Sequence, residues 1–558
     1  MNRADEIQVQ NLDHLGLVAG IIDEIGLVEQ INSLVGQHEC ERVSSGHVVK
    51  AMILNGLGFV SAPLYMFSKF FEGKAIEHLI GEGIKAEHLN DDRLGRVMDK
   101  LYLSGLSQLF MAVALGAAKK FGVAIKSTHL DSTSFHVHGK YEYKLPEVCF
   151  ITGEFSPDDP KWSDVEETVV PNPIEITYGY SRDHRPDLKQ FILDLICSGD
   201  GDVPLFLRVA DGNEADKAVF AEILCDFSKQ LTLDSLMVAD SALYSAANLE
   251  QMKQLKWLCR VPLTVKQAKN LVSELTEKEL LKSAVKGYFL AERSSNYGGI
   301  AQRWLVVESQ ARREADLRRH WQRLEKAEQE ADKKMQRLCA QKFSSSEAAI
   351  EASQDLAKKL NYHLLTNVQV VKVLDQRQKA SKKAGQSENH SYQIQGTWER
   401  NLSVIETETR RAGRFVLATN VIEIKELSND EMLTEYKAQQ SVERGFGFLK
   451  DPLFFADSVF LKSPERVEAL AMLMGLCLLV YTLAQRQLRQ ALKQSQSGIK
   501  NQLGKLTERP TLRWIFQCFQ SVHLLVVNGV KHISNLTDER LSILRFFPES
   551  SRRYYLLL

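Results

Sequence analysis

The feature that most constrains this chain is a narrow polar stripe between Tyr436 and Lys450. Tyr436, Gln439, Glu443 and Lys450 follow one another at spacings of three, four and seven residues. On a helix with about 100° per residue, these four side chains fall within an arc of roughly 60°. A packing stripe is normally apolar, so a stripe that combines a phenol, an amide, a carboxylate and an ammonium group predicts a functional site.

Signals for the ends of this helix stand on both sides of the stripe. Ser428 and Glu431 have the spacing of a capping box, which starts a helix. Asp451 precedes Pro452, and the residue before a proline disfavours the helical conformation. We therefore expect one helix that begins near Ser428 and ends near Asp451.

Length and composition indicate an ordinary globular protein of several domains. The chain has 558 residues, of which 44% are hydrophobic and 25% charged, so we expect three or four domains. The net charge is −1, which means that any surface for nucleic acid must be a local basic patch. The stretch Lys500–Leu558 is one candidate, with nine Lys and Arg against four Asp and Glu.

Cysteine spacing and hydropathy favour a cytoplasmic protein. The eight cysteines are scattered without a C-x-x-C pair, which indicates reduced thiols and neither disulfides nor a zinc site. The first ten residues contain no apolar segment of a secretory signal. The apolar run Ala469–Ala484 is short for a membrane span, and we expect a buried or interface helix, with a membrane segment as the alternative.

The first half of the chain changes from helical to strand-like periodicity. Residues 1–120 predict helices, either a helix-turn-helix-like module or a bundle that only packs on the core. From residue 123 the pattern predicts a strand, then a loop over about Pro146–Pro173 and two strands around a turn at Asp183–Pro186. A further strand, a helix, a strand, a helix and a strand follow up to residue 263.

A long interruption follows, over about residues 264–411. It begins with strand-like pieces and continues as a charged helical stretch, Gln310–Leu360, whose break at Ser344–Ser346 predicts two antiparallel helices. The simplest interpretation of its charge is a solvated helix face. Arg414–Asn420 predicts a strand just before the polar stripe, and the chain from Pro452 is expected to be mostly helical.

Two aspartates lie where strands are expected to present ligands. Asp131 lies within one predicted strand, and Asp240 ends the apolar segment that precedes Ser241. Taken alone, each is as well explained by a strand-end cap or a turn. Ligands of open α/β sheets bind at the carboxyl ends of strands, where both could converge with Glu443. Three converging carboxylates would require cations, and their oxygen atoms favour Mg²⁺ or Mn²⁺.

The stripe resembles the Y-x2-R-x3-E-x6-K signature of DDE transposases of bacterial insertion sequences, in the IS-four superfamily, with Gln439 in place of the arginine. The order of LDSTSFHVHG, GYSRDHRPDLKQ, ADSALYS and RFVLATN is similar to the sixteen-thirty-four group of that superfamily. The resemblance implies an α/β ribonuclease-H-like catalytic core interrupted by a long β-plus-helical insertion and flanked by N- and C-terminal helical domains. The expected domains are residues 1–120, 121–263, 264–411, 412–451 and 452–558.

The resemblance also implies roles for individual residues. Asp131, Asp240 and Glu443 would form a triad that holds two Mg²⁺ or Mn²⁺ ions for in-line phosphoryl transfer. The expected DNA contacts are Tyr436, Gln439, Lys450, Arg444, Arg182, Arg185, Lys189 and Trp304. Alternatives remain open, since Asp183 and Asp187 could pair with the basic residues of their turn. Trp304 could be a core residue instead of stacking on a flipped base. His129, His136 and His138 are expected to be surface or packing residues rather than zinc ligands.

The expected function is that of a homodimeric DNA transposase in the bacterial cytoplasm, associated with the nucleoid when bound to DNA. It would cleave the terminal inverted repeats of its element, free the ends through hairpins, and join them to target DNA. The helical N-terminal module and the basic C-terminal stretch are the candidates for end recognition and dimerisation. The alternatives are a metal-dependent nuclease on the same fold and a domesticated, catalytically inactive DNA-binding protein.

Overall fold

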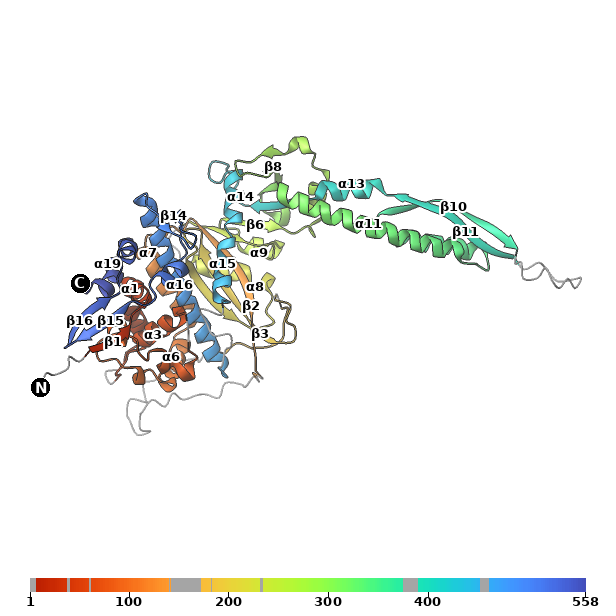
Figure 1. Cartoon of the computed structure of the whole chain (residues 1–558). Helices are drawn as coiled ribbons and strands as arrows, with labels where there is room; N and C mark the ends of the chain where they lie inside the picture. The colour runs from red at the N-terminus through yellow and green to blue at the C-terminus, as the bar shows by residue number, and fades with distance from the viewer. Residues whose placement is uncertain are drawn as a thin grey trace, which may run out of the picture. The chain divides into compact units, whose positions relative to one another are not determined.

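The computed structural model describes residues 7–37, 41–59, 62–139, 141, 172–181, 183–230, 234–374, 390–451 and 461–558. The chain forms two compact units. The first unit comprises Met1–Leu258 and Glu435–Leu558, and the second comprises Cys259–Thr434. The first unit is therefore discontinuous in sequence, and the colours of Figure 1 show which segments belong to each.

A mixed sheet forms the core of the first unit. Its strands lie in the order β4-β3-β2-β5, and β3 is antiparallel to both of its neighbours while β5 is parallel to β2. Apart from one strand, the order of strands and helices along the chain is the one that the sequence predicted. The elements are β2 (Ser127–Val137), β3 (Lys189–Ser198), β4 (Pro204–Ala210), α8 (Asp216–Ser228), β5 (Leu236–Ala239), α9 (Ala246–Gln251) and β6 (Trp257–Val261). The boundary between the two units falls within β6.

One predicted strand of this region does not form. Residues 172–181 were expected to pair as a strand with the segment after the turn at Asp183–Pro186. Only Thr177 makes an isolated bridge there, with Gln190 of β3. The hydroxyl of Ser181 accepts the N–H of Arg185, so this segment is held to the turn by a side-chain contact rather than by a strand ladder.

Helices cover both faces of the sheet. Leu207 of β4 lies opposite Leu195 of β3 and therefore points to the same face. A Cβ on Gly475 of α16 (Pro464–Gln494) would lie 2.4 Å from Leu207 Cδ1, so α16 packs directly on this face. On the other face the ring of Phe206 meets that of Phe227 of α8. Helices α7 (Leu106–Lys120) and α15 (Gln440–Leu449) also pack on the sheet.

The long apolar helix is a core element of this unit. Helix α16 contains the run 469–484, and most of its apolar window is buried within the protein. It is long and apolar enough to cross a membrane by length and composition, but it contacts α1, α3, α6, α7, α15 and β4. Ser463 caps it by accepting the N–H of Arg466, and Pro464 stands in its first turn, where proline is tolerated. The expectation of a buried helix is confirmed.

Segments from both ends of the chain form one further part of the first unit, here called the terminal module. Strand β1 (Ile7–Asn11) pairs with β15 (His523–Val527), which pairs with β16 (Val530–Ser534) (Figure 1). The sequence predicted only helices at these ends and missed this three-stranded sheet. The module also contains α1 (Leu15–Ile25), α2 (Leu27–Val35), α3 (Ser45–Leu57), α4 (Phe67–Phe70), α5 (Ile76–Leu79), α6 (Asp91–Leu103), α17 (Leu512–Cys518), α18 (Asp538–Leu544), α19 (Glu549–Leu556) and the short pair β13 (Ile499–Lys500) and β14 (Leu506–Thr507).

Close packing joins the two ends of the chain within this module. A Cβ on Gly20 of α1 would lie 2.2 Å from the Cα atom of Ser551 in α19, so the two helices touch through their backbones. Lys50 Nζ donates to Asp23 at 2.7 Å and to the hydroxyl of Tyr554 at 3.1 Å. Because Lys50 is buried, these partners satisfy a charge that would otherwise be costly.

The second unit contains four antiparallel sheet strands and a long arm. The sheet has the order β12-β9-β8-β7, and β12 is the strand predicted at Arg414–Asn420. The arm consists of α11, α12 and the hairpin of β10 and β11. The sequence analysis predicted the two helices but missed the hairpin. The bounds are β7 (Leu281–Lys282), β8 (Tyr288–Ser295), β9 (Gln302–Ser309), α10 (Lys266–Glu274), α11 (Gln310–Ala340), α12 (Ser346–Lys358), β10 (His363–Leu374), β11 (His390–Arg400), α13 (Leu402–Arg411) and β12 (Arg414–Thr419).

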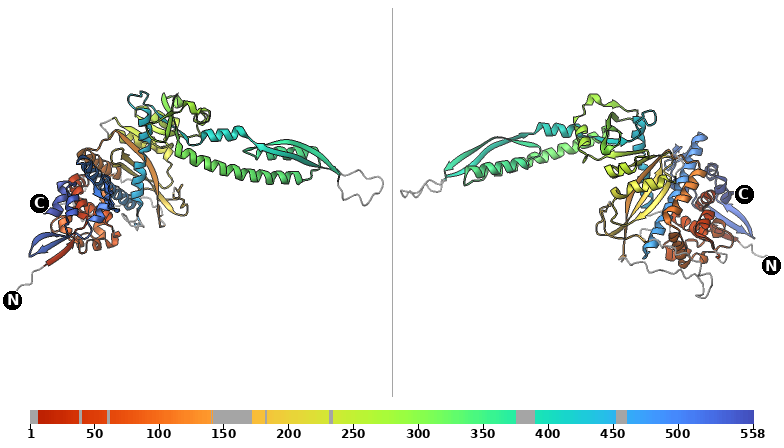
Figure 2. Two further views of the ribbon diagram at one scale, coloured as in Figure 1. Left: turned by 45° about the horizontal axis from the view of Figure 1, so that its top comes forward. Right: turned by 180° about the vertical axis from the view of Figure 1, so that it is seen from behind.

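The arm has a small hydrophobic core. Figures 1 and 2 show α11 running beside the β10–β11 hairpin, and buried side chains of α11, α12 and β11 pack between them. Two helices with a break at the predicted serines are confirmed, because Ser345 caps α12 by accepting the N–H of Ala348. The members of this core are Ala331, Met335, Leu338, Phe343, Ala349, Leu356, Leu360 and Ile394.

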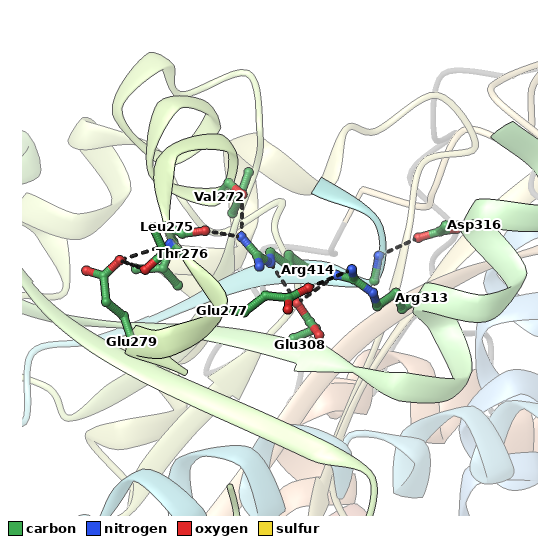
Figure 3. A network of polar contacts seen from close by, with 10 residues as sticks. Val272, Leu275, Thr276, Glu277, Glu279, Glu308, Arg313, Asp316 and Arg414 are labelled. Atoms are coloured by element: carbon green, nitrogen blue, oxygen red, sulfur yellow. Dashed lines mark hydrogen bonds and ion pairs between the residues drawn. The ribbon is translucent and has the colours of Figure 1, made fainter. Parts of the chain in front are cut away.

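A buried ionic contact fixes the start of α11 to the sheet of the second unit (Figure 3). Glu308, near the end of β9, accepts from Arg414 of β12 at 2.8 Å and from Arg313 of α11 at 3.2 Å. Arg414 is 3% exposed and also donates to the carbonyl oxygens of Val272 and Leu275. Its donors are thus satisfied although it is buried, as a buried charge requires.

Candidate active site

The two candidate aspartates occupy adjacent positions on neighbouring parallel strands. Asp131 lies in β2, and Asp240 directly follows β5. Leu130 lies opposite Ala239 in the register, so Asp131 and Asp240 are the next facing positions. Neighbouring strands are about 4.8 Å apart, and facing residues of parallel strands point to the same side. The structure therefore brings together these two of the predicted acids.

Both aspartates also accept hydrogen bonds from the backbone that follows them. Asp131 Oδ1 accepts the N–H of Ser132 at 2.8 Å, and Asp240 Oδ1 accepts the N–H of Ala242 at 2.7 Å. The contact of Asp240 forms an Asx turn, which explains the small residues after it. Both side chains are partly exposed, so their oxygen atoms can be approached from solvent.

The segment with the polar stripe differs from the single helix that the sequence predicted. It forms two helices, α14 (Asn429–Lys437) and α15 (Gln440–Leu449). At the junction the N–H groups of Ala438 and Ser441 bond to carbonyl groups only three residues earlier, at 3.1 and 2.8 Å. Such bonds belong to a 3-10 turn, with three residues per turn. The uniform spacing of about 100° per residue is therefore wrong across Gln439, and the stripe is offset there.

The predicted ends of this segment are confirmed. The N–H of Ser428 donates to Glu431 Oε2 at 2.8 Å, and the N–H of Glu431 donates to Ser428 Oγ at 3.3 Å. These reciprocal bonds are the capping box that the sequence indicated. At the other end α15 stops at Leu449, and Lys450 is its C-terminal cap.

Helix α15 packs on the face of the sheet that carries Asp131. Leu195 of β3 lies opposite Asp131 and points to the same face. A Cβ on Gly445 of α15 would lie 3.0 Å from Leu195 Cδ2, so a larger residue would press the helix away from the sheet. The absence of a side chain at Gly445 lets the helix approach the strand next to Asp131.

Glu443 is not grouped with the two aspartates. It stands two residues before Gly445, which is about 200° around the helix, and its side chain is exposed. Among the residues that the structure describes, no three His, Cys, Asp or Glu side chains form a group that could hold a metal ion. Asp131 and Asp240 offer the oxygen donors that divalent cations prefer, whereas the complete triad stays a prediction.

The two basic residues of α15 are paired with acids. Arg444 makes a bidentate contact with Asp202 in the turn between β3 and β4, and these hydrogen bonds raise its pKa. Lys450 Nζ donates to Asp183 Oδ2 at 2.6 Å and lies 5.5 Å from the ring centre of Phe135. The sequence singled out both basic residues but not Asp202, whose partner is 242 residues away.

Of the basic residues around the turn at Asp183–Pro186, Arg185 pairs with an acid of the turn as the alternative explanation stated, whereas Lys189 has a backbone partner. Arg185 makes two hydrogen bonds to Asp187, at 2.9 and 2.8 Å. Lys189 Nζ donates to the backbone carbonyl oxygen of Tyr141 at 2.9 Å. Arg182 lies outside the described residues.

Trp304 is a core residue of the second unit. It is 2% exposed, and its Nε1 donates to Gln302 Oε1 at 3.0 Å. The face of the ring is covered by protein, so it is not open to a flipped base. This placement corrects its assignment as a DNA contact and agrees with the alternative of a packing tryptophan.

The histidines of β2 are packing or surface residues. His129 is fully buried, and burial lowers its pKa to about 4, although Glu435 Oε2 lies 3.9 Å from Nε2. His136 Nε2 lies 2.9 Å from Ser181 Oγ, and burial lowers its pKa as well. His138 is exposed. None of them belongs to a metal-binding group within the described part of the chain.

A basic group that the sequence did not indicate lies beside α15. Burial and then the charge of Arg509 lower the pKa of Arg489, which also interacts with Arg444 and Asp202. These arginines come from α15, α16 and the segment after β14, so no sequence spacing connects them. Arg489 thus stands between two further arginines, with Asp202 as the acid beside them.

Comparison with protein families identifies the chain. A family model described as "Transposase DDE domain" matches residues 128–481, which is more than half of the chain. The chain belongs to the transposase DDE domain family. A second model, described as "Domain of unknown function (DUF4277)", matches residues 7–115, from β1 into α7. No match was found among curated proteins.

As a member of the transposase DDE domain family, the chain is a DNA transposase, an enzyme that acts on DNA. The match spans β2, β5 and α15, which carry Asp131, Asp240 and Glu443. A comparison of structures finds the piggyBac transposase synaptic complex with hairpin DNA, at 8% identity and a TM-score of 0.35. That similarity covers 91% of this chain and 79% of the other.

Proposed function

We propose that this transposase cuts an insertion sequence from DNA at its terminal inverted repeats and joins the ends to a target, on a ribonuclease-H-like core with a long insertion. The facing positions of Asp131 and Asp240 on parallel strands carry the proposal. The stripe Y-x2-Q-x3-E-x6-K supports membership of the IS-four superfamily and its sixteen-thirty-four group. Such an enzyme acts in the cytoplasm.

Asp131, Asp240 and Glu443 are the proposed catalytic residues. Their carboxylates would hold two Mg²⁺ or Mn²⁺ ions, which when bound activate water or a 3′-hydroxyl and stabilise the leaving oxygen. The strand positions of the two aspartates fit such donors. Glu443 is the third donor by its place in the signature, and α15 packs on the correct face of the sheet.

The remaining residues of the stripe and its neighbours would position the DNA backbone. Tyr436, Gln439 and Lys450 are the proposed phosphate contacts, with Arg444 beside them. Gln439 can donate a hydrogen bond, but it lacks the charge and the bidentate fork of the signature arginine. Arg489 and Arg509 extend this positive group, because Arg489 interacts with both Arg444 and Arg509.

Two ends must be brought together for excision, so we propose that a homodimer acts on DNA and frees the ends through hairpins. The rival functions are a nuclease that never joins strands and an inactive DNA-binding protein. A strand-transfer assay distinguishes the proposed transposase from a nuclease, because only a transposase yields a joined product. Sedimentation with and without DNA tests the dimer.

Cleavage of a labelled duplex that carries the element's end is the decisive experiment. Wild type with Mg²⁺ or Mn²⁺ should cut at the end, with a hairpin visible on a denaturing gel. Glu443→Gln should still bind the duplex and lose cutting by at least about a hundredfold, as expected when a metal ligand is lost. Glu423→Gln, an exposed glutamate outside the site, is the matched control and should cut normally. Binding without cutting by wild type would favour the inactive DNA-binding protein.

A further inference from the structure

Helix α11 carries a regular row of exposed cations. Arg312, Arg319, Lys326 and Lys333 are spaced by seven residues, which returns to nearly the same face of a helix every two turns. Two further cations follow members of this row by four residues and widen it on the same side. All six are exposed. This surface is here called the basic ridge, and it consists of Arg312, Arg319, Arg323, Lys326, Lys333 and Arg337.

Two acidic residues of α11 are used on another side of the helix. Glu328 accepts from Arg400 at 2.6 Å, and Asp332 accepts from Trp398 Nε1 at 2.9 Å. Both partners lie in β11, so these acids hold the helix to the hairpin. The buried side chains of α11, among them Leu324 and Met335, face the core of the arm. On the side of the basic ridge the six cations are accompanied by two acids, Asp316 and Glu330.

Most of the ridge has no acidic partner. Arg312 and Arg319 share Asp316, at 3.7 and 2.7 Å. The acid Glu330 on the same side pairs with Lys334. Within the residues that the structure describes, the other four cations of the ridge form no ion pair; they are Arg323, Lys326, Lys333 and Arg337.

The ridge is also held rigidly. One end of α11 is fixed by the contact of Glu308 with Arg313 and Arg414 (Figure 3), and its second half, from Glu328 onward, is packed on the hairpin. The cations from Arg312 to Arg337 span about 37 Å at 1.5 Å per residue. One turn of duplex DNA is about 34–36 Å long. A straight helix of this length can therefore reach phosphates at two successive passages of the backbone.

We propose that the basic ridge of α11 binds the phosphate backbone of duplex DNA without reading its sequence. The proposal rests on the proposed function, which makes duplex DNA the substrate. The chain has a net charge of −1, so attraction to DNA depends on such local surfaces. Lysine and arginine side chains without acidic partners can release counterions from DNA at no loss of internal ion pairs.

The salt dependence of DNA binding tests the ridge. The variant Arg323→Gln, Lys326→Gln, Lys333→Gln, Arg337→Gln removes the four cations that lack acidic partners and keeps residues with good helix propensity. Binding of the full chain to a labelled duplex of arbitrary sequence is measured by fluorescence anisotropy at several NaCl concentrations. Each lost phosphate contact lowers the slope of log affinity against log salt by about 0.9, so a decrease of up to roughly 3.6 is expected.

Two further variants separate charge from folding and from net charge. Lys266→Gln, Lys269→Gln, Lys358→Gln, Lys359→Gln makes the same change in net charge at exposed positions of the same unit but off the ridge, and should keep the wild-type slope. The variant Arg323→Lys, Arg337→Lys keeps the charge of the ridge and should also keep the wild-type slope. Circular dichroism should show the same helix content in all of them.

The outcomes distinguish the ridge from the proposed function. A four-glutamine ridge variant that binds with the wild-type slope overturns the ridge alone. An equal loss in the off-ridge variant also overturns it, because net charge would then be the cause. Failure of wild type to bind any duplex overturns both the ridge and the proposed function.

Discussion

The guanidinium group of Arg444 donates two hydrogen bonds to the carboxylate of Asp202, at 2.8 and 2.7 Å. The contact joins the helix of the candidate catalytic glutamate to the turn between β3 and β4. Bidentate pairs of this kind have the geometry that arginine also uses for phosphate. The arginine is 58% exposed, and exposed pairs contribute only about 0–1 kcal/mol. If Arg444 binds a DNA phosphate as proposed, Asp202 is the competitor that the phosphate has to replace.

Removal of this competitor should strengthen DNA binding. Asp202→Asn is expected to raise affinity for an end duplex about two- to fivefold, since an exposed pair of this strength no longer has to be broken. Arg444→Gln should lower it. Asp226→Asn, which breaks the exposed pair with Lys229, is the control and should have no effect. Anisotropy titrations at fixed salt measure all three, and equal affinities throughout would exclude Arg444 as a DNA contact.

The terminal module should be sensitive to a single methyl group. In Gly20→Ala the new Cβ would lie 2.2 Å from the backbone of Ser551, so α1 and α19 must separate. Overpacking of this kind costs about 1–3 kcal/mol of the free energy of unfolding. Gly447→Ala in α15 meets nothing within 4 Å and should be neutral or slightly stabilising. Hydrogen exchange of the amides in α1 and α19 distinguishes the two variants. Wild-type exchange rates in Gly20→Ala would contradict the close packing.

The contact at the base of the arm should contribute strongly to the stability of the second unit. Glu308→Gln leaves the buried Arg414 without its acidic partner, which typically costs about 3 kcal/mol or more. Glu277→Gln removes only the 75% exposed partner of Arg313 and should cost less than about 1 kcal/mol. Exchange rates of amides in β9 and β12 report the difference. Similar exchange rates in both variants would show that the buried pair contributes no more to the stability of the unit than the exposed pair does.

Glu468 should make stability depend on pH. It lines a cavity of about 770 Å³, and burial raises its pKa to about 8 although it accepts the N–H of Ile174. The folded state holds the proton of the Glu468 carboxyl group more tightly than the unfolded state does. The stabilisation of the fold by this protonated group is therefore complete below about pH 4.5 and is lost as pH rises through 8. Glu468→Gln should therefore unfold less readily than wild type at pH 8.5, by roughly 1 kcal/mol or more.

Urea unfolding at pH 5.5 and pH 8.5 measures this effect. Wild type should lose stability between the two values more than Glu468→Gln does. Glu222→Gln, another acid that lines the cavity, is the control and should keep the wild-type pH dependence. A parallel shift of wild type and Glu468→Gln would mean that the carboxyl group is already ionised in the folded state at pH 5.5.

The sequence predicted the elements whose signals are local. Strand β2, the capping box at Ser428 and Glu431, and the buried helix α16 follow from alternation, side-chain spacing and apolar length. The facing of Asp131 and Asp240 was also predictable, because parallel strands end at the same edge of a sheet. In the first three of these cases one segment alone contains the physical cause, whereas the facing of the aspartates depends on two strands.

The remaining features depend on partners far away in the chain. Strand β1 has only five residues, most of them exposed, and its partner β15 lies in a distant part of the sequence. The tightened turn at Gln439 changes the direction of Glu443 relative to the uniform helix. The placement of Trp304 in the core depends on neighbours in the second unit. Asp202 and Arg489 meet Arg444 only through tertiary folding.

The pairing of β1 with β15 also has a consequence for synthesis on the ribosome. Asn11 emerges early, but its contact with His523 forms only after 512 further residues have been made. Helix α1 likewise cannot pack on α19 until α19 has been synthesised. Until then the first helices keep apolar surface without its cover, so the nascent chain needs protection from aggregation. A transposase synthesised in this order acquires its terminal module last.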